Sequence, residues 1–323
     1  MAALPVNLRP VDRLDVTVVV DLSVDLLLPS GGPAIRPPMA YEWTAGDQLR
    51  AEHGYALLVQ TWVGDEAHSV IYDAGLSPGT FLWNCDVLGI TPTEPEAILL
   101  SHGHADHHGG LEGVFRRYGR ARLPVVLHPD ARLDRRVVLP SGTALHLPPP
   151  SVNDLEREGA RVLEEPGPTL WGAETMLLSG QVERTTDYER GFPLQQKLEG
   201  SDWAPDPWVW DDQNLVVDVR DRGLVVMSGC SHAGAVNVMR NAKRLTGLDR
   251  VHAFLGGMHL SGGMFEPIIP STLDDVAAIA PDYLVAGHCT GYKALAAIVQ
   301  RFPDQCLASS VGSRYSFSAP PAA

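Results

Sequence analysis

The chain has 323 residues, of which 45% are hydrophobic and 20% are charged. That balance is typical of a globular protein with a sizeable core and excludes global disorder. The 25 Lys and Arg residues stand against 39 Asp and Glu residues, so the formal net charge is −14. Because nucleic acid binding requires clustered cations, this charge argues against nucleic acid as a partner and against nuclease activity.

The apolar runs are too short to span a membrane. Val16–Val20 and Leu26–Leu28 are interrupted by Asp21 and Asp25, far below the ~18 residues that a spanning helix needs. No signal sequence is recognisable at the start of the chain. We therefore expect a cytoplasmic protein without membrane contact. Four cysteines in a chain of this length do not indicate a disulfide framework.

Short runs rich in β-branched residues and bounded by Gly, Pro or Asp predict ten strands. In chain order these are Asp15–Leu22, Tyr55–Val63, Ser69–Tyr72, Ala97–Leu100, Val125–Leu127, Met176–Leu178, Leu215–Val219, Leu224–Met227, Val251–Leu255 and Tyr283–Ala286. Helical patterns predict helices over Gly110–Tyr118, Ala235–Leu245, Ser271–Ile279 and Lys293–Arg301, the third with Ser271 as its N-cap. This order favours a layered α/β architecture with two sheets inside and helices outside, formed as one domain over residues 1–323.

Residues 185–212 are expected to form an irregular loop inserted into that domain. The segment is rich in Gly and Pro and carries Trp203, Trp208 and Trp210. Long loops without secondary structure inside a compact domain often serve function. We expect these aromatic side chains either to cover a ligand in the site or to anchor the loop on the core.

The most informative segment is Ser101–Leu111, SHGHADHHGGL, which follows an apolar strand. His102 and His104 are two residues apart, so the end of an extended strand points both to the same side. Asp106 and His107 lie where the chain turns into a helix, and the glycines permit that tight backbone path. Imidazole nitrogen and carboxylate oxygen are suitable ligands for Zn²⁺, Mn or Fe.

These four side chains predict a metal site with one or two ions. If two ions are present, His102 and His104 would bind one, and Asp106 and His107 would bind the other. Zn²⁺ is the expected metal, with Mn or Fe as alternatives. His108 is expected to lie outside the ligand set, because His107 already fills the ligand position.

The pattern His-x-His-x-Asp-His after a buried strand resembles the metallo-β-lactamase fold superfamily. The earlier run Ile71–Gly75, IYDAG, is similar to that superfamily's first motif. The resemblance implies an α+β fold of the αββα four-layer sandwich type, with two central mixed β-sheets flanked by helices. It also implies that Asp73, at the end of a strand, supports the metal loop without being a ligand itself.

Five further motifs resemble one branch of that superfamily, named after 7,8-dihydropterin-6-methyl-4-(β-D-ribofuranosyl)aminobenzene 5′-phosphate synthase. They are Gly180–Arg184 (GQVER), Asp211–Leu215 (DDQNL), Ser228–Gly234 (SGCSHAG), Gly256–Leu260 (GGMHL) and Ala286–Gly291 (AGHCTG). Together with the earlier motifs, the resemblance covers nearly the whole chain.

The later motifs end apolar strands and supply further candidate ligands. His288 matches the last histidine of the superfamily, and His232 is the next candidate. Cys230 stands where a bridging Asp is usual, and the separate third histidine is not apparent, with Gln181 near that position. Either His232 replaces the missing donor or Cys230 ligates as a thiolate. Cys230 could also be a small buried hydrophobic residue.

The resemblance and metal chemistry together predict an enzyme. Water bound to Zn²⁺ ionises near pH 7, which makes a nucleophile available. Asp106 would position the nucleophile or relay its proton, and His259 would assist the leaving group or contact the substrate. Arg184 is a candidate for binding a phosphate or carboxylate of the substrate, and Trp208 and Trp210 for stacking on it.

Three functions therefore stay open. The first is a metal-dependent hydrolase acting on a small anionic or heterocyclic substrate. The second is a synthase-like transferase that joins a pterin to a ribosylated aminobenzene phosphate. The third is an iron-containing redox or metal-binding protein. In the first two readings the partner is a small molecule, phosphorylated or pterin-like, and the sequence leaves the oligomeric state open.

Overall fold

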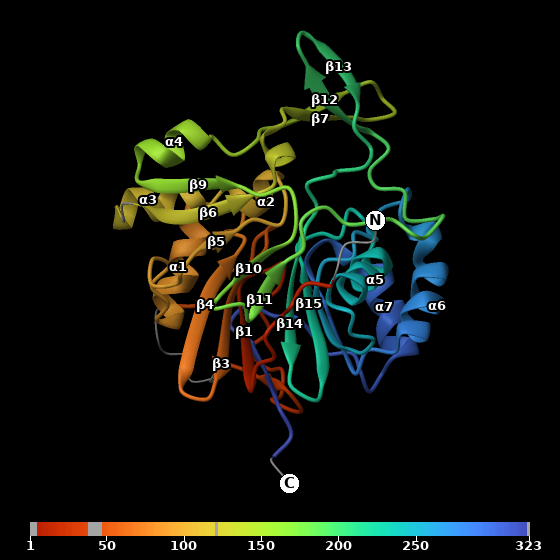
Figure 1. Ribbon diagram of the computed structural model, residues 1–323. Helices are drawn as coiled ribbons and strands as arrows, with labels where there is room; N and C mark the ends of the chain where they lie inside the picture. The colour runs from red at the N-terminus through yellow and green to blue at the C-terminus, as the bar shows by residue number, and fades with distance from the viewer. Residues whose placement is uncertain (1–4, 38–46, 120–121, 322–323) are drawn as a thin grey trace.

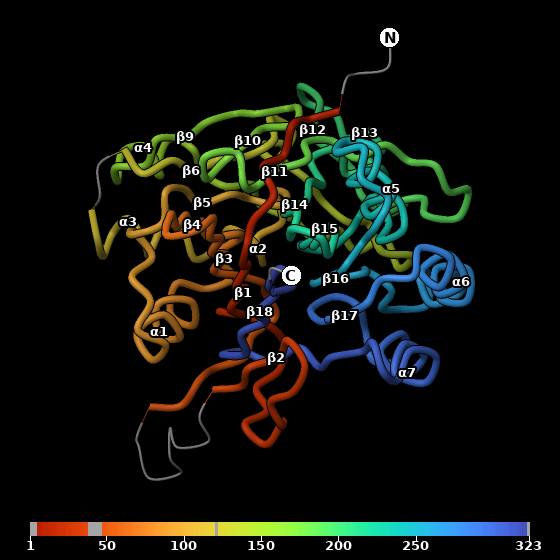
Figure 2. Tube along the Cα trace, turned by 60° about the horizontal axis from the view of Figure 1, so that its bottom comes forward, coloured from red at the N-terminus to blue at the C-terminus, as the bar shows by residue number. Residues whose placement is uncertain are grey.

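The computed structural model describes residues 5–37, 47–119 and 122–321. Two β-sheets pack face to face, and helices cover the outer face of each, which gives the expected αββα sandwich (Figure 1). Figure 2 shows the two groups of helices on opposite sides of the strands. Within the part of the chain that the structure describes, none of the helices has the length and apolar character needed to cross a bilayer.

The helices divide between the two outer layers. One layer holds α1 (Pro78–Leu88), α3 (Leu111–Tyr118) and α4 (Val152–Arg157). The other holds α5 (Ala235–Thr246), α6 (Ile269–Ile279) and α7 (Tyr292–Arg301). The four helices that the sequence predicts are confirmed as α3, α5, α6 and α7.

Both central sheets are mixed. In spatial order, the first sheet contains β2 (Ala34–Ile35), β18 (Arg314–Ser318), β1 (Arg13–Val20), β3 (Ala56–Val63), β4 (Glu66–Tyr72), β5 (Ile98–Leu99), β6 (Leu123–Leu127) and β9 (Ala160–Glu164). The second contains β10 (Thr169–Trp171), β11 (Met176–Leu178), β14 (Asn214–Val219), β15 (Gly223–Ser228), β16 (Val251–Gly256) and β17 (Tyr283–Ala286). β4, β5, β6 and β9 pair in parallel, as do β15, β16 and β17, and the other pairs are antiparallel. All ten predicted strands are present.

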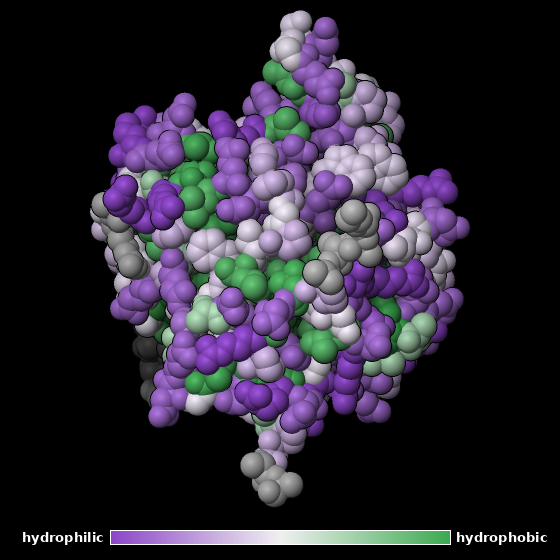
Figure 3. Space-filling view, in the orientation of Figure 1, coloured by the Kyte–Doolittle hydropathy of each residue, from purple (hydrophilic) through white to green (hydrophobic). Residues whose placement is uncertain are grey.

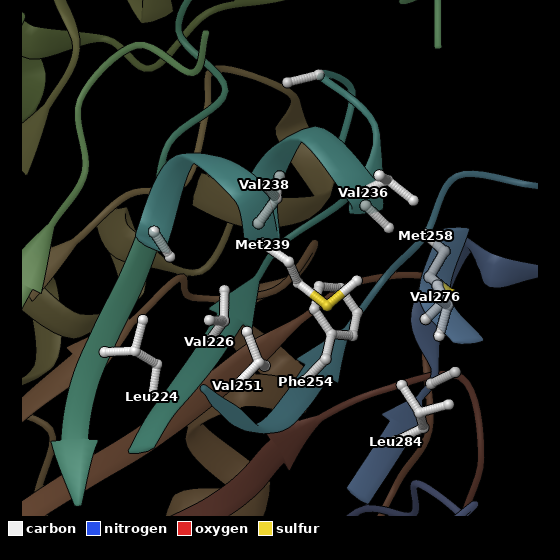
Figure 4. Packing of buried hydrophobic residues seen from close by; sticks show 14 of the residues in the cluster. Leu224, Val226, Val236, Val238, Met239, Val251, Phe254, Met258, Val276 and Leu284 are labelled. Carbon is white, nitrogen blue, oxygen red and sulfur yellow. The ribbon is translucent and has the colours of Figure 1, made fainter. Parts of the chain in front are cut away.

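The hydrophobic core follows from the alternation of side chains along the strands. Val225 and Met227 of β15 lie in the cluster between the two sheets, whereas Leu224 and Val226 belong to the cluster under the helices. Successive side chains of a strand point to opposite faces, so one strand serves both layers. Figure 4 shows Leu224 and Val226 on the same side as Met239 of α5. Each such side chain contributes roughly 1.5–3 kcal/mol when fully buried.

A third sheet of four strands projects beyond the sandwich (Figure 1). It pairs β8 (Ala144–Leu147) and β7 (Arg135–Val138) with β12 (Gln195–Glu199) and β13 (Asp202–Pro205). The expectation that residues 185–212 are irregular is therefore wrong for the β12–β13 hairpin. The strand QQKLE is polar and has no apolar alternation to reveal it, because it pairs on a sheet whose visible face is mostly hydrophilic (Figure 3).

The start of α6 also differs from the sequence prediction. The helix begins at Ile269, directly after a 3₁₀ turn over Glu266–Ile268, so Ser271 is not its N-cap. Pro270 lies in the first turn, where its missing N–H leaves no helical hydrogen bond unmade. The chain thus enters α6 from an existing turn and needs no capping side chain.

Candidate metal centre

The first four candidate donors follow a strand of the first sheet. After β5 the chain carries His102 and His104 and then enters the short helix α2 (Ala105–His108), which bears Asp106 and His107. His104 has extended backbone angles and directly precedes the helix. The change from strand end to helix places all four side chains on one edge of the sheet, as the spacing predicts.

The second sheet supplies three more donors at the same edge. Cys230 and His232 follow β15, and His288 follows β17, which runs parallel to β15 with β16 between them. The carboxyl ends of parallel strands meet at one edge, so these side chains converge although they are far apart in sequence. The backbone N–H of His288 donates to Asp21 Oδ1 at 2.8 Å, which fixes its left-handed turn at φ 44°.

The seven side chains form two groups of donor atoms, and within each group the atoms lie within 4.8 Å of one another. The first group, here named the three-histidine cluster, consists of His102, His104 and His232. The second, here named the thiol cluster, consists of Asp106, His107, Cys230 and His288. The structure therefore groups His102 with His104 and Asp106 with His107, in the same pairs that the sequence analysis formed.

In the three-histidine cluster the ring nitrogens face one another. His102 Nε2 lies 3.1 Å from His104 Nδ1 and 3.2 Å from His232 Nε2. All three rings are buried. Burial and then the neighbouring histidines lower the pKa of His102 and His232 well below the usual range, so both rings are neutral at pH 7. Neutral imidazole is the form that binds a metal ion.

The thiol cluster combines nitrogen, oxygen and sulfur donors. His107 Nε2 lies 3.2 Å from Cys230 Sγ, and His288 Nε2 lies 3.4 Å from Asp106 Oδ2. Burial raises the pKa of Asp106, but the charges of His107 and His288 outweigh burial and lower it overall. Burial raises the pKa of the Cys230 thiol well above its usual value.

The chemistry of both clusters fits divalent metal ions. Among the described residues, His232 Nδ1 and both ring nitrogens of His288 are buried without a hydrogen-bond partner. Buried polar atoms are normally paired, and a cation in the thiol cluster would accept the lone pair of His288 Nε2, the ring nitrogen that faces Asp106. The rings of His102 and His107 are 4.2 Å apart between centroids, so the clusters are adjacent. This donor set suits Zn²⁺ and also Fe or Mn.

Asp73 contacts the loop that carries the donors. Its Oδ2 lies 2.7 Å from His107 Nδ1, and its Oδ1 accepts from the backbone N–H of Ser101 at 2.7 Å. The contact to Nδ1 leaves Nε2 of His107 facing the thiol cluster, the arrangement by which carboxylates orient metal-binding histidines. Burial lowers the pKa of His107, but Asp106 and Asp73 outweigh burial and raise it to about 9.

The motif Asp211–Asn214, to which the sequence analysis gave no role, binds both loops that carry donors. Asp211 Oδ2 accepts from the N–H of Gly103, between two candidate ligands, at 2.8 Å. Asp212 Oδ2 accepts from the N–H of Ala233, next to the candidate ligand of the second sheet, at 2.8 Å. Burial raises the pKa of Asp212 to about 7. The two carboxylates thus fix the backbone on both sides of the three-histidine cluster.

The other two residues of this motif bind the strands that lead into the same loops. Gln213 donates from its side chain to the carbonyl of Leu100 and from its backbone to the carbonyl of Ser101. Asn214 donates to the hydroxyl of Ser228 at 2.9 Å. The motif therefore joins the first and second sheets directly beneath the donors. Its similarity to one branch of the superfamily was the only sequence signal that could have found this role.

The third sheet is joined to the site by a buried arginine. Arg135 of β7 pairs with Asp211 at 2.6 Å and with Asp206 at 2.8 Å, and its side chain is 1% exposed. On β12, the Oε1 atom of Gln195 lies 2.8 Å from the Nε2 atom of His104. The projecting sheet therefore contacts the three-histidine cluster directly and through Asp211. No sequence pattern indicated Arg135 or Gln195.

His259 lies beside the three-histidine cluster and outside both groups of donors. Its ring centroid is 4.3 Å from that of His232 and 4.4 Å from that of Phe265. Burial lowers the pKa of His259 to about 3, so the ring is neutral at pH 7. A cavity of about 360 Å³ opens next to it, lined by His232, His259, Phe265, Met258 and Arg190 among others. Arg190 carried no signal in the sequence.

Arg184, Trp208 and Trp210 do not line that cavity. The guanidinium carbon of Arg184 lies 4.6 Å from the centroid of the Trp210 ring and 5.3 Å from that of Trp208. Arg184 also donates to the backbone carbonyl of Trp208. In this structure the guanidinium of Arg184 therefore packs against the two rings that were expected to stack on a substrate.

A family model described as the metallo-beta-lactamase superfamily matches residues 50–245. The 7,8-dihydropterin-6-methyl-4-(beta-D-ribofuranosyl)-aminobenzene-5′-phosphate synthase of Methanocaldococcus jannaschii is 28% identical over 263 residues, which cover 79% of this chain and 86% of the relative. An uncharacterized protein of the same organism is 28% identical over 265 residues, which cover 80% of this chain and 91% of that protein.

A solved structure supports the same fold. It is described as a metal-dependent hydrolase of the beta-lactamase superfamily and is 24% identical to this chain. The TM-score is 0.70, and the match covers 95% of this chain and 100% of the other. The similarity in sequence to the synthase and the similarity in structure to a hydrolase agree on architecture and differ in the named reaction.

Proposed function

The chain belongs to the metallo-beta-lactamase superfamily, and on that premise we propose that it is a metal-dependent hydrolase of a small anionic or heterocyclic molecule. One observation carries the proposal: seven potential ligands from two sheets converge in two adjacent clusters. Divalent ions in these clusters would acidify a water molecule to a pKa of about 7 and polarise the bond to be cleaved.

Asp106 is suited to orienting a water molecule during such a reaction. Its carboxylate lies between His107 and His288, at 3.6 and 3.4 Å, and is 17% exposed, so it can reach a water molecule. The histidines lower the pKa of Asp106 and keep it an acceptor at neutral pH. A carboxylate in this position can accept a hydrogen bond from the attacking water and orient it.

His259 and the cavity beside it are suited to binding the substrate. The neutral ring of His259 can donate one hydrogen bond to a leaving group but cannot serve as a strong acid at pH 7. The cavity volume of about 360 Å³ matches a small molecule. Its wall combines the apolar side chains of Met258 and Phe265 with the cation of Arg190 and the carboxyl groups of Asp187 and Glu189. Arg190 is the group in this wall that could hold an anionic part of the substrate.

The test is a comparison of metal-free and reloaded protein. Protein stripped with a chelator would be reloaded with Zn²⁺, Mn²⁺ or Fe²⁺ and assayed against chromogenic phosphodiesters, lactones and esters. We expect turnover of at least one class, loss of turnover after chelation, and loss in His102→Ala. The control is His146→Ala, an exposed histidine paired with Asp134. Full activity without metal, or failure of the protein to bind any of the three ions, would contradict the proposal.

The second candidate is a transferase like the synthase of Methanocaldococcus jannaschii. It is favoured by sequence similarity that covers 86% of that relative. Trp208 and Trp210 would then serve a pterin, which requires that Arg184 leave their rings. Titration with a reduced pterin should quench tryptophan fluorescence in the wild type and less in Trp210→Leu. An unchanged spectrum at saturating pterin would count against this candidate.

A further inference from the structure

Two cysteines meet at the edge of the metal centre. Cys230 follows β15, and Cys289 lies in the 3₁₀ turn over His288–Thr290 that follows β17. β16 runs between those strands, and the residue after it is Gly257, which has no side chain to separate the two thiols. Convergence of strand ends thus brings together cysteines that are 59 residues apart.

The contacts place the Cys289 sulfur against the backbone of Cys230. Cys289 Sγ donates to the carbonyl oxygen of Cys230 at 3.5 Å. A Cβ atom on Gly257 would lie 2.6 Å from Cys289 Sγ and 3.2 Å from Cys230 Cα. Any other residue at position 257 would therefore push into the Cys289 sulfur and the backbone of Cys230.

The two thiols differ in access to solvent. Cys230 is buried, with 3% of its surface exposed, and its sulfur lies 3.2 Å from His107 Nε2. Cys289 is half-buried and does not belong to the thiol cluster. A small oxidant therefore reaches Cys289 first, with Cys230 waiting as its partner, the arrangement typical of a sensing cysteine beside a resolving one.

We propose that Cys230 and Cys289 are a redox modification site at which a hydroperoxide forms a reversible disulfide. The Cys289 sulfur attacks a peroxide oxygen, the O–O bond breaks, and water leaves with formation of a sulfenic acid. The Cys230 sulfur then attacks the Cys289 sulfur, the S–O bond breaks, and a second water leaves. Two thiols and one hydrogen peroxide thus give one disulfide and two waters.

This disulfide would act on the metal centre, a consequence that depends on the proposed function. Oxidation removes Cys230 from the thiol cluster and leaves Asp106, His107 and His288 as donors. Changes that only disturb the support of a ligand cost about 10- to 100-fold in metal affinity, so loss of a ligand should cost at least as much. Bound metal should in turn slow the oxidation, because it engages the Cys230 sulfur.

The experiment maps thiols in the full-length protein, metal-free and zinc-loaded, after treatment with hydrogen peroxide. Free thiols are alkylated, counted and located by peptide mass spectrometry, and released zinc is measured in parallel. We expect loss of two of the four thiols, a Cys230–Cys289 linkage, slower oxidation in the loaded protein, and recovery with dithiothreitol. Cys289→Ser should form no linkage, and Cys306→Ser, another half-buried cysteine, should behave like the wild type.

Two outcomes would overturn this inference: oxidation of Cys289 to a sulfinic acid while Cys230 stays free, or linkage through Cys85 or Cys306. The circular dichroism of Cys289→Ser, matched to the wild type, shows that a missing linkage is not due to misfolding. A disulfide in a protein that binds no metal would contradict the proposed function but not this inference. Metal-dependent hydrolysis without the disulfide would contradict this inference but not the proposed function.

Discussion

The carboxylate of Asp211 accepts a hydrogen bond from the backbone N–H of Gly103 at 2.8 Å. Gly103 lies between His102 and His104, and a Cβ atom there would come within 2.3 Å of a backbone oxygen. The loop is therefore held from both sides: close packing leaves no room for a side chain, and Asp211 fixes the peptide that separates two candidate ligands. This contact gives a direct route to test how the metal centre is supported.

Replacing Asp211 with Asn should weaken metal binding at the three-histidine cluster by about 10- to 100-fold, because outer contacts orient ligands. Cobalt loading separates the clusters, since only the thiol cluster can give a thiolate absorption band. In Asp211→Asn we expect the thiolate band of the thiol cluster to persist while the ion of the three-histidine cluster is lost. The control is Asp134→Asn, which removes the same charge from an exposed pair with His146. Equal loss of metal in both variants would refute the positioning role.

Replacing Asp73 with Asn should act on the other cluster. The variant loses the charge that fixes His107 Nδ1, so cobalt should bind the thiol cluster about 10- to 100-fold more weakly and the thiolate band should shift or disappear. The control is Asp86→Asn, which removes the same charge from an exposed ion pair. A wild-type band and affinity in Asp73→Asn would show that Asp73 does not orient the ligand.

Stability should depend on pH through Glu189. Its carboxylate accepts from the backbone N–H groups of Val236 and Asn237 at the start of α5, but burial raises its pKa from 4.5 to about 7. Between those values the folded protein keeps a proton that the unfolded chain releases, so stability falls as pH rises through this window and then levels off. The change amounts to roughly 3 kcal/mol.

Urea unfolding of the metal-free protein at pH 5 and pH 8 measures this change. Glu189→Gln cannot ionise, so the difference between the two pH values should shrink in the variant by most of that amount. An equal pH dependence in both proteins would mean that Glu189 ionises as freely in the folded state as in the unfolded chain.

Arg190 should determine affinity for the anionic part of a substrate. Arg190→Met should raise the KM for an anionic substrate about tenfold or more, the usual scale for a lost charge-assisted hydrogen bond, and leave kcat nearly unchanged. A neutral analogue should show a much smaller effect. The control is Arg184→Met, whose guanidinium lies against Trp210 and does not line the cavity. A larger increase in KM for Arg184→Met than for Arg190→Met would support the prediction from the sequence that Arg184 binds the anionic part of the substrate.

The sequence predicts the sandwich and its donors well because both depend on short-range patterns. Strands such as Leu224–Met227 are apolar throughout, since they are buried on both faces, and their bounds follow from flanking turns. The donors of the Ser101–Leu111 segment are neighbours in the chain, so their spacing alone brings them together. Whether these residues bind metal stays a prediction.

The third sheet and the supports of the site could not be predicted in this way. Arg135 and Asp211 are 76 residues apart, and neither stands in a pattern that names its partner. The polar strand Gln195–Glu199 is defined by pairing with β7, a long-range contact that leaves no periodic signal. Likewise, composition cannot tell which arginine faces a cavity: Arg184 follows a recognisable motif, yet Arg190 lines the hollow beside His232.

The donors are shared between the two halves of the sandwich. His102, His104, Asp106 and His107 belong to the first sheet's side of the interface, and the rest follow strands of the second. An ion bound in either cluster would therefore fasten one half of the molecule to the other. Loading with metal should slow amide hydrogen exchange most along β5 and β15, the two strands that such a bond would lock together.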